Sequence, residues 1–330
     1  MTGSYEKSYR EVIEEINAFG KRREACLFIL DFEQKKGIFI PNPMAQEEVL
    51  FSINGSTNAP SVAPQKGITL HANPIPYEVY KEKFDIVDHG LRRGDTFLCN
   101  LTVSTPVQLN AHLRDVFFAT QARYKLYVPG RFVCFSPEIF ITINAQGEIA
   151  SHPMKGTIDA SIPNAEEIIL NDYKETAEHN TIVDLIRNDL NIVSDYVRVE
   201  RFRYIDAIQL PNGRGLLQVS SKIVGRLSQQ YHDRLGTIID RLLPAGSISG
   251  APKEATLDII RRAEGDPRGY YTGIVGYYDG KTLDTGVLIR FIEEVGEGHK
   301  NFRSGGGITI NSNPEEEYKE VIQKVYIPLL

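Results

Sequence analysis

The sequence contains no tryptophan and only three cysteines in 330 residues. Cys26, Cys99 and Cys134 are odd in number, lie far apart and form no CxxC pair. This spacing excludes a disulfide framework and argues against a metal site made of thiolates. We therefore expect all three cysteines to be buried in the core, where free cysteine is usually found.

A long apolar segment is also missing, because no run approaches the roughly 20 residues that cross a bilayer. Residues 1–19 are charged and show helical periodicity, with no basic stretch leading into an apolar signal core. The hydrophobic content of 42% and the charged content of 24% are typical of a soluble globular protein. These features predict a cytoplasmic protein that does not enter a membrane.

The chain lacks both a basic field and a nucleotide-binding loop. Its formal net charge of -6 disfavours nucleic acid as a partner. Two glycine-rich segments, 243–253 (LPAGSISGAPK) and 304–308 (SGGGI), match neither a Walker loop nor the GxGxxG fingerprint. Their glycines could form simple turns or bring backbone N–H groups close to an anion. A small-molecule site is favoured, in which local groups or a metal ion hold any anionic ligand.

No repeat, low-complexity tract or flexible linker divides the chain into independent units. We expect residues 1–74, with a hairpin over 24–40 and a connection over 55–76, to form a short N-terminal lobe of the same compact unit as residues 75–330. Further strands are predicted at 97–103, 131–136, 138–144, 197–202, 216–225, 270–278 and 287–294. Their polar–apolar alternation, mixed irregularly with helices, predicts an α+β or irregular α/β fold with mainly antiparallel sheets and helices outside.

Lys155 stands in the string 152–157 (HPMKGT), between a predicted strand and a predicted helix. Gly156 leaves room for a ligand to approach the backbone, and Pro153 disfavours a helical start before the lysine. A lysine held in this way is a candidate nucleophile. The alternative is a solvated surface charge, which is the common state of lysine.

A helix predicted between residues 164 and 190 carries acids beside its inward face. Ile182, Leu185 and Ile186 are three and four residues apart, and the same spacing extended backwards reaches Glu178 and then Glu175. An ionised carboxylate in the interior costs several kcal/mol unless a cation or several donors compensate it. A surface salt bridge is the alternative for both acids.

The C-terminal helix predicted after Pro314 repeats this pattern, because Glu317, Glu320, Val321 and Lys324 fall on one face. A solvated charged face is one interpretation. In the other, the two helices supply opposed carboxylates for Mg²⁺, which prefers oxygen ligands and keeps positions for water or substrate.

These residues belong to an ordered set of motifs that resembles the chorismate-utilising enzymes, which include anthranilate, aminodeoxychorismate, isochorismate and salicylate synthases. The motifs are 94–97 (GDTF), 136–138 (SPE), 152–157, 174–190 (KETAEHNTIVDLIRNDL), 243–253, 268–273 (RGYYTG), Arg290, 304–308 and 314–320 (PEEEYKE). The resemblance covers residues 75–330. It implies the chorismate-binding fold, in which antiparallel sheets pack face to face with helices outside.

The resemblance also implies roles for individual residues. It assigns Mg²⁺ to Glu178 and Glu320, with Glu175 and Glu317 nearby as acids that organise the metal shell or its waters. Chorismate carries two carboxylates, which suit cations and oriented donors. The family pattern places around the substrate Arg290, Lys324, Tyr271, the backbone N–H groups near Gly306 and Gly307, and two further polar contacts, Thr157 and Ser249. For these last two an ordinary turn hydrogen bond is an equal alternative.

Three positions separate the members of the family. Lys155 stands where anthranilate synthases have alanine, as it does in aminodeoxychorismate synthases. Leu217 replaces the histidine of the HLVS string, which assists pyruvate elimination in anthranilate synthases. Leu98, four residues after Gly94, replaces the water-activating lysine of isochorismate and salicylate synthases.

The chain therefore most resembles component I of aminodeoxychorismate synthase. This enzyme catalyses the first step from chorismate to 4-aminobenzoate and folate. In the mechanism implied, the neutral amine of Lys155 attacks ring C2 while Glu138 protonates the departing C4 hydroxyl, and ammonia then attacks C4 and expels the lysine. Positive charge from Mg²⁺ and Arg290 is expected to lower the lysine pKa.

The expected partner is a separate glutamine amidotransferase subunit that supplies ammonia, because no cysteine lies in a nucleophile elbow. No segment resembles an appended lyase or aligns with the tryptophan-binding segment of part of the family. Two alternative functions remain, which are anthranilate synthase component I and a non-catalytic chorismate-binding subunit.

Overall fold

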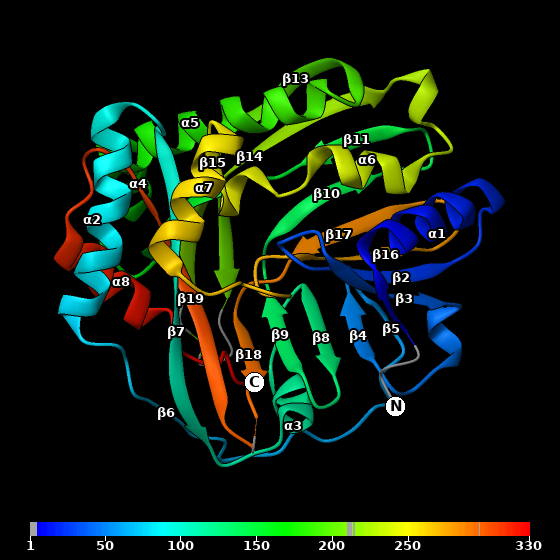
Figure 1. The fold of residues 1–330 in the computed structure, drawn as a ribbon, viewed down its shortest axis with the longest axis horizontal. Coiled ribbons are helices and arrows are strands. Elements are labelled where there is room, and N and C mark those ends of the chain that lie inside the picture. The colour runs from blue at the N-terminus through cyan, green and yellow to red at the C-terminus, as the bar shows by residue number, and fades with distance from the viewer. Residues whose placement is uncertain (1–4, 210–212, 214, 297) are drawn as a thin grey trace.

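Two antiparallel β-sheets form the centre of the molecule, and helices lie around them (Figure 1). The computed structural model describes residues 5–209, 213, 215–296 and 298–330. Every pairing between named strands in this part of the chain is antiparallel. The α+β class expected from the sequence is therefore confirmed.

The larger sheet has ten strands and the smaller sheet has nine. In spatial order the larger sheet contains β1 (Glu6–Ser8), β3 (Lys36–Pro41), β2 (Cys26–Leu30), β16 (Ile274–Tyr278), β17 (Leu283–Val287), β10 (Ile139–Ile143), β11 (Glu148–Ser151), β14 (Gly215–Leu227) and β12 (Met154–Asp159), with β13 (Ser194–Gln209) paired to β14. The smaller sheet contains β15 (Gly250–Ala251), β7 (Leu98–Leu109), β19 (Lys300–Ile308), β18 (Phe291–Glu294), β9 (Phe132–Ser136), β8 (Tyr124–Val128), β4 (Leu50–Ile53) and β5 (Ser56–Thr57), with β6 (Leu70–Ala72) paired to β7.

The helices pack against specific strands. They are α1 (Tyr9–Arg22), α2 (Tyr77–Arg93), α3 (Leu113–Ala119), α4 (Ala165–Asn171), α5 (Tyr173–Asn191), α6 (Leu235–Leu242), α7 (Lys253–Glu264) and α8 (Pro314–Gln323), with short 3₁₀ turns η2 (Pro43–Ala45), η3 (Gln229–Tyr231) and η4 (Gly246–Ile248). Helices α1 and α6 pack together beside β2 and β3, while α2 and α7 lie against β7. Helix α5 contacts β13 and β14, and α8 contacts β19.

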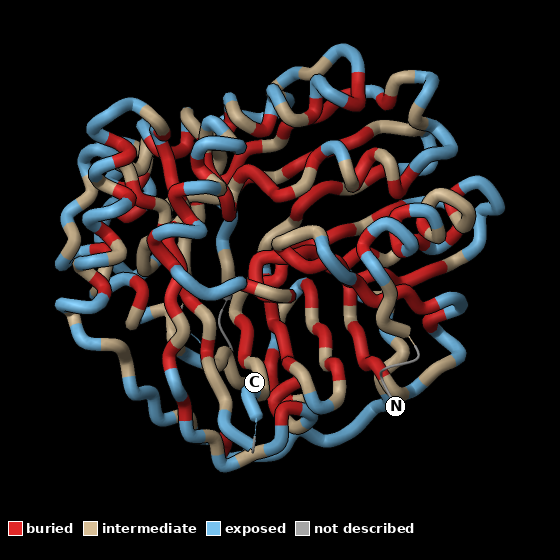
Figure 2. The backbone as a smooth tube through the Cα atoms, viewed as in Figure 1, coloured by how far each residue is buried: buried red, intermediate tan, exposed pale blue. Residues whose placement is uncertain are grey.

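The strand β2 shows how the core is divided, because all five of its residues are buried. Leu27 and Ile29 point into a cluster shared with Phe51 and Phe291 of the other sheet. Phe28, between them, points the other way into the cluster shared with the helices. A strand alternates its side chains between two faces, so β2 is covered on both. The two sheets therefore pack face to face, and the buried tube segments of Figure 2 follow the strands.

Residues 5–74 contribute strands to both sheets. Strand β2 pairs with β16 in the larger sheet, and β4 pairs with β8 in the smaller one. The hairpin predicted over 24–40 is confirmed as β2 and β3. All three cysteines are buried and free, as expected from their spacing.

Two predicted elements are interrupted in the structure. The strand predicted over 287–294 is wrong as one element, because β17 ends at Val287 and β18 begins at Phe291. Arg290 between them has a φ of 56°, and the chain crosses there from the larger to the smaller sheet. The helix predicted between 164 and 190 is divided at Asp172 into α4 and α5.

Several segments predicted outside strands contain strands. The connection predicted over 55–76 includes β5 and β6. Lys155 lies inside β12 rather than between a strand and a helix, and β12 has an irregular register between Met154 and Thr157. Gly156 in this irregularity has a φ of 85°, which glycine adopts without strain. The glycine-rich segment 304–308 forms the end of β19 and pairs with β7. Simple turns are one of the two interpretations of these glycines given above, and the pairing with β7 does not support them.

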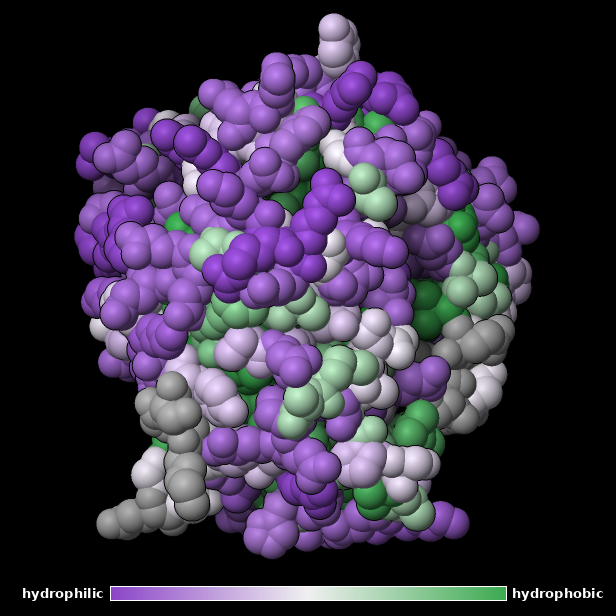
Figure 3. Space-filling view, turned by 90° about the vertical axis from the view of Figure 1, so that its right-hand side faces the viewer, coloured by the Kyte–Doolittle hydropathy of each residue, from purple (hydrophilic) through white to green (hydrophobic). Residues whose placement is uncertain are grey.

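One face of the molecule is largely hydrophilic, with smaller hydrophobic patches between the polar side chains (Figure 3). The described helices include none that has both the length and the apolar character needed to cross a membrane. Apolar residues of α1 such as Val12 and Ile16 are instead buried inside the protein, each 0% exposed.

Asp172 begins helix α5, since its side chain accepts a hydrogen bond of 2.9 Å from the backbone N–H of Glu175. We predict that Asp172→Ala lowers the free energy of unfolding by about 1 kcal/mol, because an N-cap partner is lost. Urea unfolding followed by circular dichroism measures this change. Asp184→Ala is the matched control, because Asp184 is an exposed acid on the same helix with a weak contact to Arg187. Equal losses in both variants would contradict the capping role.

Candidate active site

A cavity of about 660 Å³ is lined by residues of both sheets, of α5 and α8, and of η4. It brings together site residues that are widely separated in the sequence. These are Glu138, Lys155, Thr157, Glu175, Glu178, Tyr271, Arg290, Gly306, Gly307, Glu317, Glu320 and Lys324. Ser249 does not line it: this buried hydroxyl donates a hydrogen bond of 2.8 Å to the carbonyl of Ala245. For Ser249 the structure therefore favours the alternative of a turn hydrogen bond.

Lys155 projects from β12 toward helix α5. Its Nζ donates a hydrogen bond of 3.2 Å to Oε2 of Glu178, and its side chain is 24% exposed. Two features favour glycine at the next position. Gly156 has a positive φ, and a Cβ there would lie 3.0 Å from Oε2 of Glu175. The strand irregularity and the glycine together let the lysine and both acids share one end of the cavity.

The Lys155 ammonium faces mainly negative charge. Burial lowers its pKa, but the charges of Glu178, Glu320 and Glu175 outweigh burial, so the pKa lies above the usual value. The acids that raise it include Glu178 and Glu320, to which the resemblance assigns Mg²⁺, so the lowering expected from the ion and Arg290 stays a prediction. Lys155 is therefore protonated in this arrangement, and it must lose a proton before its nitrogen can act as a nucleophile.

Lys324 lies at the C-terminal end of α8 and lines the cavity. Its Nζ lies 2.6 Å from Oε1 of Glu320 and donates a hydrogen bond of 2.9 Å to the carbonyl of Gly305. Burial lowers its pKa, and Glu320 offsets only part of this effect. Glu317 on the same helix is buried, with 2% exposure, whereas Glu320 is exposed. The stripe predicted on this helix thus faces the cavity with one buried and one open acid.

Two glycines of β19 form the surface between these charged walls. A Cβ on Gly307 would lie 3.2 Å from Nζ of Lys155 and 3.3 Å from Cδ1 of Leu98. A Cβ on Gly306 would lie 3.6 Å from Oε2 of Glu317 and 4.0 Å from Nζ of Lys324. A side chain at either position would occupy space in front of the charged groups, so both positions favour glycine.

Glu138 lies between β9 and β10 and contacts η4. Its Oε1 accepts a hydrogen bond of 2.5 Å from the hydroxyl of Ser247. Burial raises the pKa of Glu138, and the hydrogen bond from Ser247 and the charges of Lys155 and Arg290 offset this only in part. A carboxyl that keeps its proton to higher pH is suited to act as a general acid.

Three other predicted residues complete the lining. The guanidinium of Arg290 lies 5.6 Å from the ring centroid of Tyr326, so a cation and an aromatic face share that part of the wall. Tyr271 is 3% exposed, and burial raises its pKa to about 12, so its hydroxyl stays a neutral donor. Thr157 is an exposed residue of β12, opposite Gln218 of β14.

The acids of α5 and α8 fit a hard divalent cation by their chemistry. Glu178 is buried with 8% exposure, and the pKa of Glu175 is raised by burial and by the charge of Glu178. Such crowding of negative charge is relieved by a cation. The described residues contain no preformed group of three or more His, Cys, Asp or Glu ligands. Mg²⁺ needs no such cage, because one or two carboxylates, waters and substrate oxygens suffice.

Some lining residues were not singled out from the sequence. Ser247 lies in the segment 243–253, but its hydroxyl could not be told apart from that of Ser249 without the turn of η4. Asn100 and Gln218 line the cavity. Asn100 lies two residues after Leu98 in β7, and Gln218 follows Leu217 in β14. Strand alternation was the available signal, since it places every second side chain of a strand on one face.

A cavity that combines a lysine, a carboxyl with a raised pKa, opposed acids and several cations defines an enzyme pocket for a small anionic molecule. A family model described as chorismate binding enzyme matches residues 40–329. The chain therefore belongs to the chorismate-binding enzymes, and the resemblance seen in its motifs is confirmed.

Similar proteins span several activities within this family. The chain is 50% identical to an uncharacterized PabA-like protein of Pasteurella multocida, over 98% of this chain and 99% of that one. It is 32% identical to aminodeoxychorismate synthase component 1 of Bacillus subtilis, over 77% of this chain and 56% of that one. It is 30% identical to anthranilate synthase component 1 of Saccharomyces cerevisiae, over 78% of this chain and 56% of that one.

Solved structures share the fold at lower sequence identity. The putative 2,3-dihydroxybenzoate-specific isochorismate synthase of Bacillus anthracis has a TM-score of 0.73 and 18% identity, covering 97% of this chain and 88% of that one. Anthranilate synthase component I of Streptococcus pneumoniae has a TM-score of 0.64 and 24% identity, covering 78% of this chain and 58% of that one. The architecture is thus that of the chorismate-binding enzymes.

The hydrogen bond from Ser247 generates a test of the Glu138 environment. We predict that Ser247→Ala raises the pKa of Glu138, because the donor that stabilises the carboxylate is lost. Carbon-13 NMR of glutamate-labelled protein measures the titration, with the Glu138 signal assigned by comparison with Glu138→Gln. Ser249→Ala is the matched control, since that hydroxyl bonds to Ala245 instead. A Glu138 titration that stays unchanged in Ser247→Ala would refute the contact.

Proposed function

We propose that this chain is component I of aminodeoxychorismate synthase, which replaces the C4 hydroxyl of chorismate with an amino group on the route to 4-aminobenzoate and folate in the cytoplasm. One observation carries the proposal. A Cβ built on Gly307 would lie 3.2 Å from Nζ of Lys155 and 3.3 Å from Cδ1 of Leu98, so both side chains lie next to this glycine. This supports the proposal, because the resemblance assigns the position of Lys155 to the attacking lysine and the position of Leu98, which here ends in apolar methyl groups, to the base for water.

Sequence similarity alone does not distinguish aminodeoxychorismate synthase from anthranilate synthase activity, because synthases of both kinds are similar to the chain. The residues favour amination without elimination. Leu217 stands in place of the histidine that assists pyruvate loss, and a leucine has no group that could move a proton. Leu217 itself is not among the residues that line the cavity, whereas its neighbours Leu216 and Gln218 are.

The first chemical step would use Lys155 and Glu138 together. The deprotonated Nζ of Lys155 attacks ring C2, the two ring double bonds shift, and the bond from C4 to its hydroxyl oxygen breaks. Glu138 gives its proton to that oxygen, which leaves as water. The raised pKa of Glu138 supports this role, because the carboxyl retains a proton at higher pH than usual.

The second step would use ammonia as the nucleophile. Its nitrogen attacks C4, the double bonds shift back, and the bond between C2 and the lysine nitrogen breaks. The new C4 ammonium gives up a proton and the released lysine takes one up. Glu138 regains a proton from solvent, which balances the proton that Lys155 gave to solvent before its attack. Glu178, 3.2 Å from Nζ, is placed to hold the lysine as an ammonium again.

Glu178 and Glu320 would hold Mg²⁺, with Glu175 and Glu317 beside them. The ion would supply positive charge for a substrate carboxylate and for the surrounding acids. In this structure Lys155 and Lys324 are the cations paired with Glu178 and Glu320. Arg290, Tyr271 and the backbone of the two glycines would orient the carboxylates of chorismate.

A separate amidotransferase subunit would supply the ammonia. The three cysteines are buried, and burial raises the pKa of Cys26 and Cys99 to about 12. A buried thiol with a raised pKa is a poor nucleophile for attack on glutamine. The chain itself is therefore proposed to use free ammonia only.

The test is product analysis by mass spectrometry after incubation with chorismate, Mg²⁺ and ammonium. We expect 4-amino-4-deoxychorismate from the parent protein and a loss of at least about a hundredfold in Lys155→Ala, because the covalent route is removed. Without ammonium, intact-mass spectra are expected to show a chorismate adduct on the parent but not on the variant. Chelation of Mg²⁺ is expected to stop turnover.

Other products would decide between the alternatives. Anthranilate with pyruvate would favour anthranilate synthase component I, and binding of chorismate without turnover would favour a non-catalytic subunit. Glutamine in place of ammonium is expected to give no product with the purified chain. Equal use of glutamine would contradict the proposed need for a partner.

A further inference from the structure

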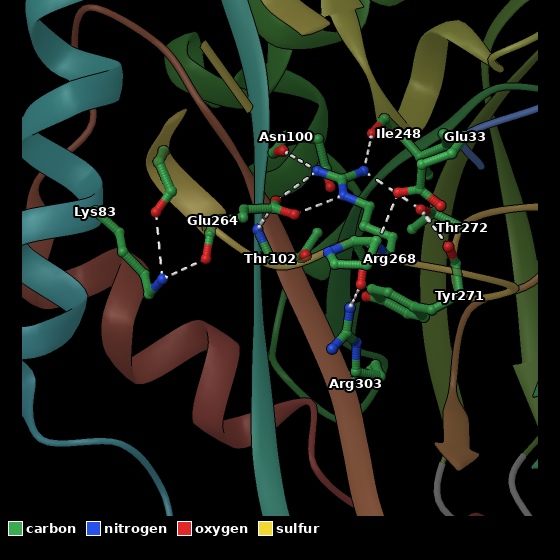
Figure 4. A network of polar contacts seen from close by, with 12 residues as sticks. Glu33, Lys83, Asn100, Thr102, Ile248, Glu264, Arg268, Tyr271, Thr272 and Arg303 are labelled. Atoms are coloured by element: carbon green, nitrogen blue, oxygen red, sulfur yellow. Dashed lines mark hydrogen bonds and ion pairs between the residues drawn. The ribbon is translucent and has the colours of Figure 1, made fainter. Parts of the chain in front are cut away.

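Arg268 is a buried cation next to the cavity, with a side chain that is 1% exposed. Each of its five guanidinium N–H donors is matched by a hydrogen bond (Figure 4). Glu264 accepts two of them, at 2.9 Å from Nε and 2.7 Å from Nη2. Burial of a charge is tolerated when it is paired and its hydrogen bonds are satisfied, so this environment suits an arginine.

The other three bonds run to segments that line the cavity. Nη1 donates to the carbonyl of Ile248 at 2.8 Å and to the hydroxyl of Thr272 at 3.3 Å, and Nη2 donates to the carbonyl of Asn100 at 2.7 Å. These partners lie in η4, in the turn before β16, and in β7. All three line the cavity, whereas Arg268 itself does not. The planar guanidinium of Arg268 therefore sets the relative positions of the three cavity-lining segments that contain these partners.

The bond to Ile248 leads directly to the acid of the proposed reaction. Ile248 follows Ser247, whose hydroxyl donates to Glu138 at 2.5 Å. The same turn is tied to β7, because the N–H of Asn100 donates to the carbonyl of Ser249 at 2.9 Å. The guanidinium thus bonds to both η4 and β7, the two segments that this backbone hydrogen bond joins.

The bond to Thr272 supports an unusual backbone conformation. Thr272 has a φ of 58°, which is disfavoured for a β-branched residue. Its hydroxyl accepts from Arg268 and donates to the carbonyl of Tyr271 at 2.6 Å. The conformation that directs Tyr271 into the cavity is therefore held in part by the arginine.

We propose that Arg268 is a positioning residue for the active site, which holds Ser247 against Glu138 and thereby sets the protonation of that carboxyl. The role of Glu138 as an acid rests on the proposed function, but its coupling to Arg268 does not. Lysine cannot replace the arginine, because a single ammonium has three donors and no planar fork to reach Glu264, Ile248 and Asn100 together.

The experiment compares the Glu138 titration in the parent protein and in Arg268→Lys, by carbon-13 NMR of glutamate-labelled protein. We expect the pKa of Glu138 to rise in Arg268→Lys, as in Ser247→Ala, because the serine donor is displaced. In the double variant the two shifts are expected not to add, because both remove the same contact. Turnover of chorismate with ammonium is expected to fall roughly tenfold to a hundredfold in Arg268→Lys.

Two further variants separate positioning from general stability. Glu264→Gln weakens the hold on the same guanidinium and keeps the side-chain volume. It replaces Arg268→Lys in the titration experiment if Arg268→Lys does not fold. Lys83→Met is the matched control, because Lys83 bonds to the Ala263 and Glu264 carbonyls on the outer side of the same network. It is expected to lower the melting temperature without moving the Glu138 titration.

The proposal is overturned if Glu138 titrates at the parental pH in a folded Arg268→Lys or Glu264→Gln protein. It is also overturned if Lys83→Met moves the titration as far, because loss of stability would then explain the shift. A shift of the titration in a chain that forms no 4-amino-4-deoxychorismate would support the positioning role while refuting the proposed function.

Discussion

The buried ion pair between Arg268 and Glu264 is the interaction on which the arrangement of the cavity depends. Besides the arginine, the Glu264 carboxylate accepts a hydrogen bond of 2.8 Å from the backbone N–H of Thr102, so the end of α7 is joined to β7. Breaking a buried pair from one side leaves an uncompensated charge, which typically costs about 3–5 kcal/mol. Because the same guanidinium also holds η4 and the turn at Thr272, stability and site geometry depend on one group.

Charge balance is the second constraint on the site. Acids of α5 and α8 face each other across a cavity that also contains Lys155, Lys324 and Arg290. In this structure the lysines neutralise the acids, with Lys155 bound to Glu178 and Lys324 to Glu320. A divalent cation and an anionic substrate would redistribute these pairs, since a metal ion competes with the ammonium groups for the same carboxylates. Each of these two carboxylates is thus paired with a lysine in this structure.

The sequence alone indicated most of the elements and nearly all of the candidate site. Antiparallel α+β architecture followed from alternating strands, and Glu178 and Lys155 followed from their motifs. Strand order and register did not follow, because pairing depends on which apolar faces meet in the folded chain. The break at Arg290 was also missed, since a crossing between sheets leaves no mark in the segment 287–294, whose apolar residues continue on both sides of the arginine.

The residue types alone define the available chemistry, namely a lysine, several acids, the cations and the glycines that leave space between them. Which of these groups meet depends on the folded chain. Ser247 rather than Ser249 contacts Glu138, and Gly307 places Lys155 beside Leu98. The physical reason is that residue type sets charge and hydrogen-bonding capacity, whereas direction and distance come from backbone packing between segments far apart in the chain.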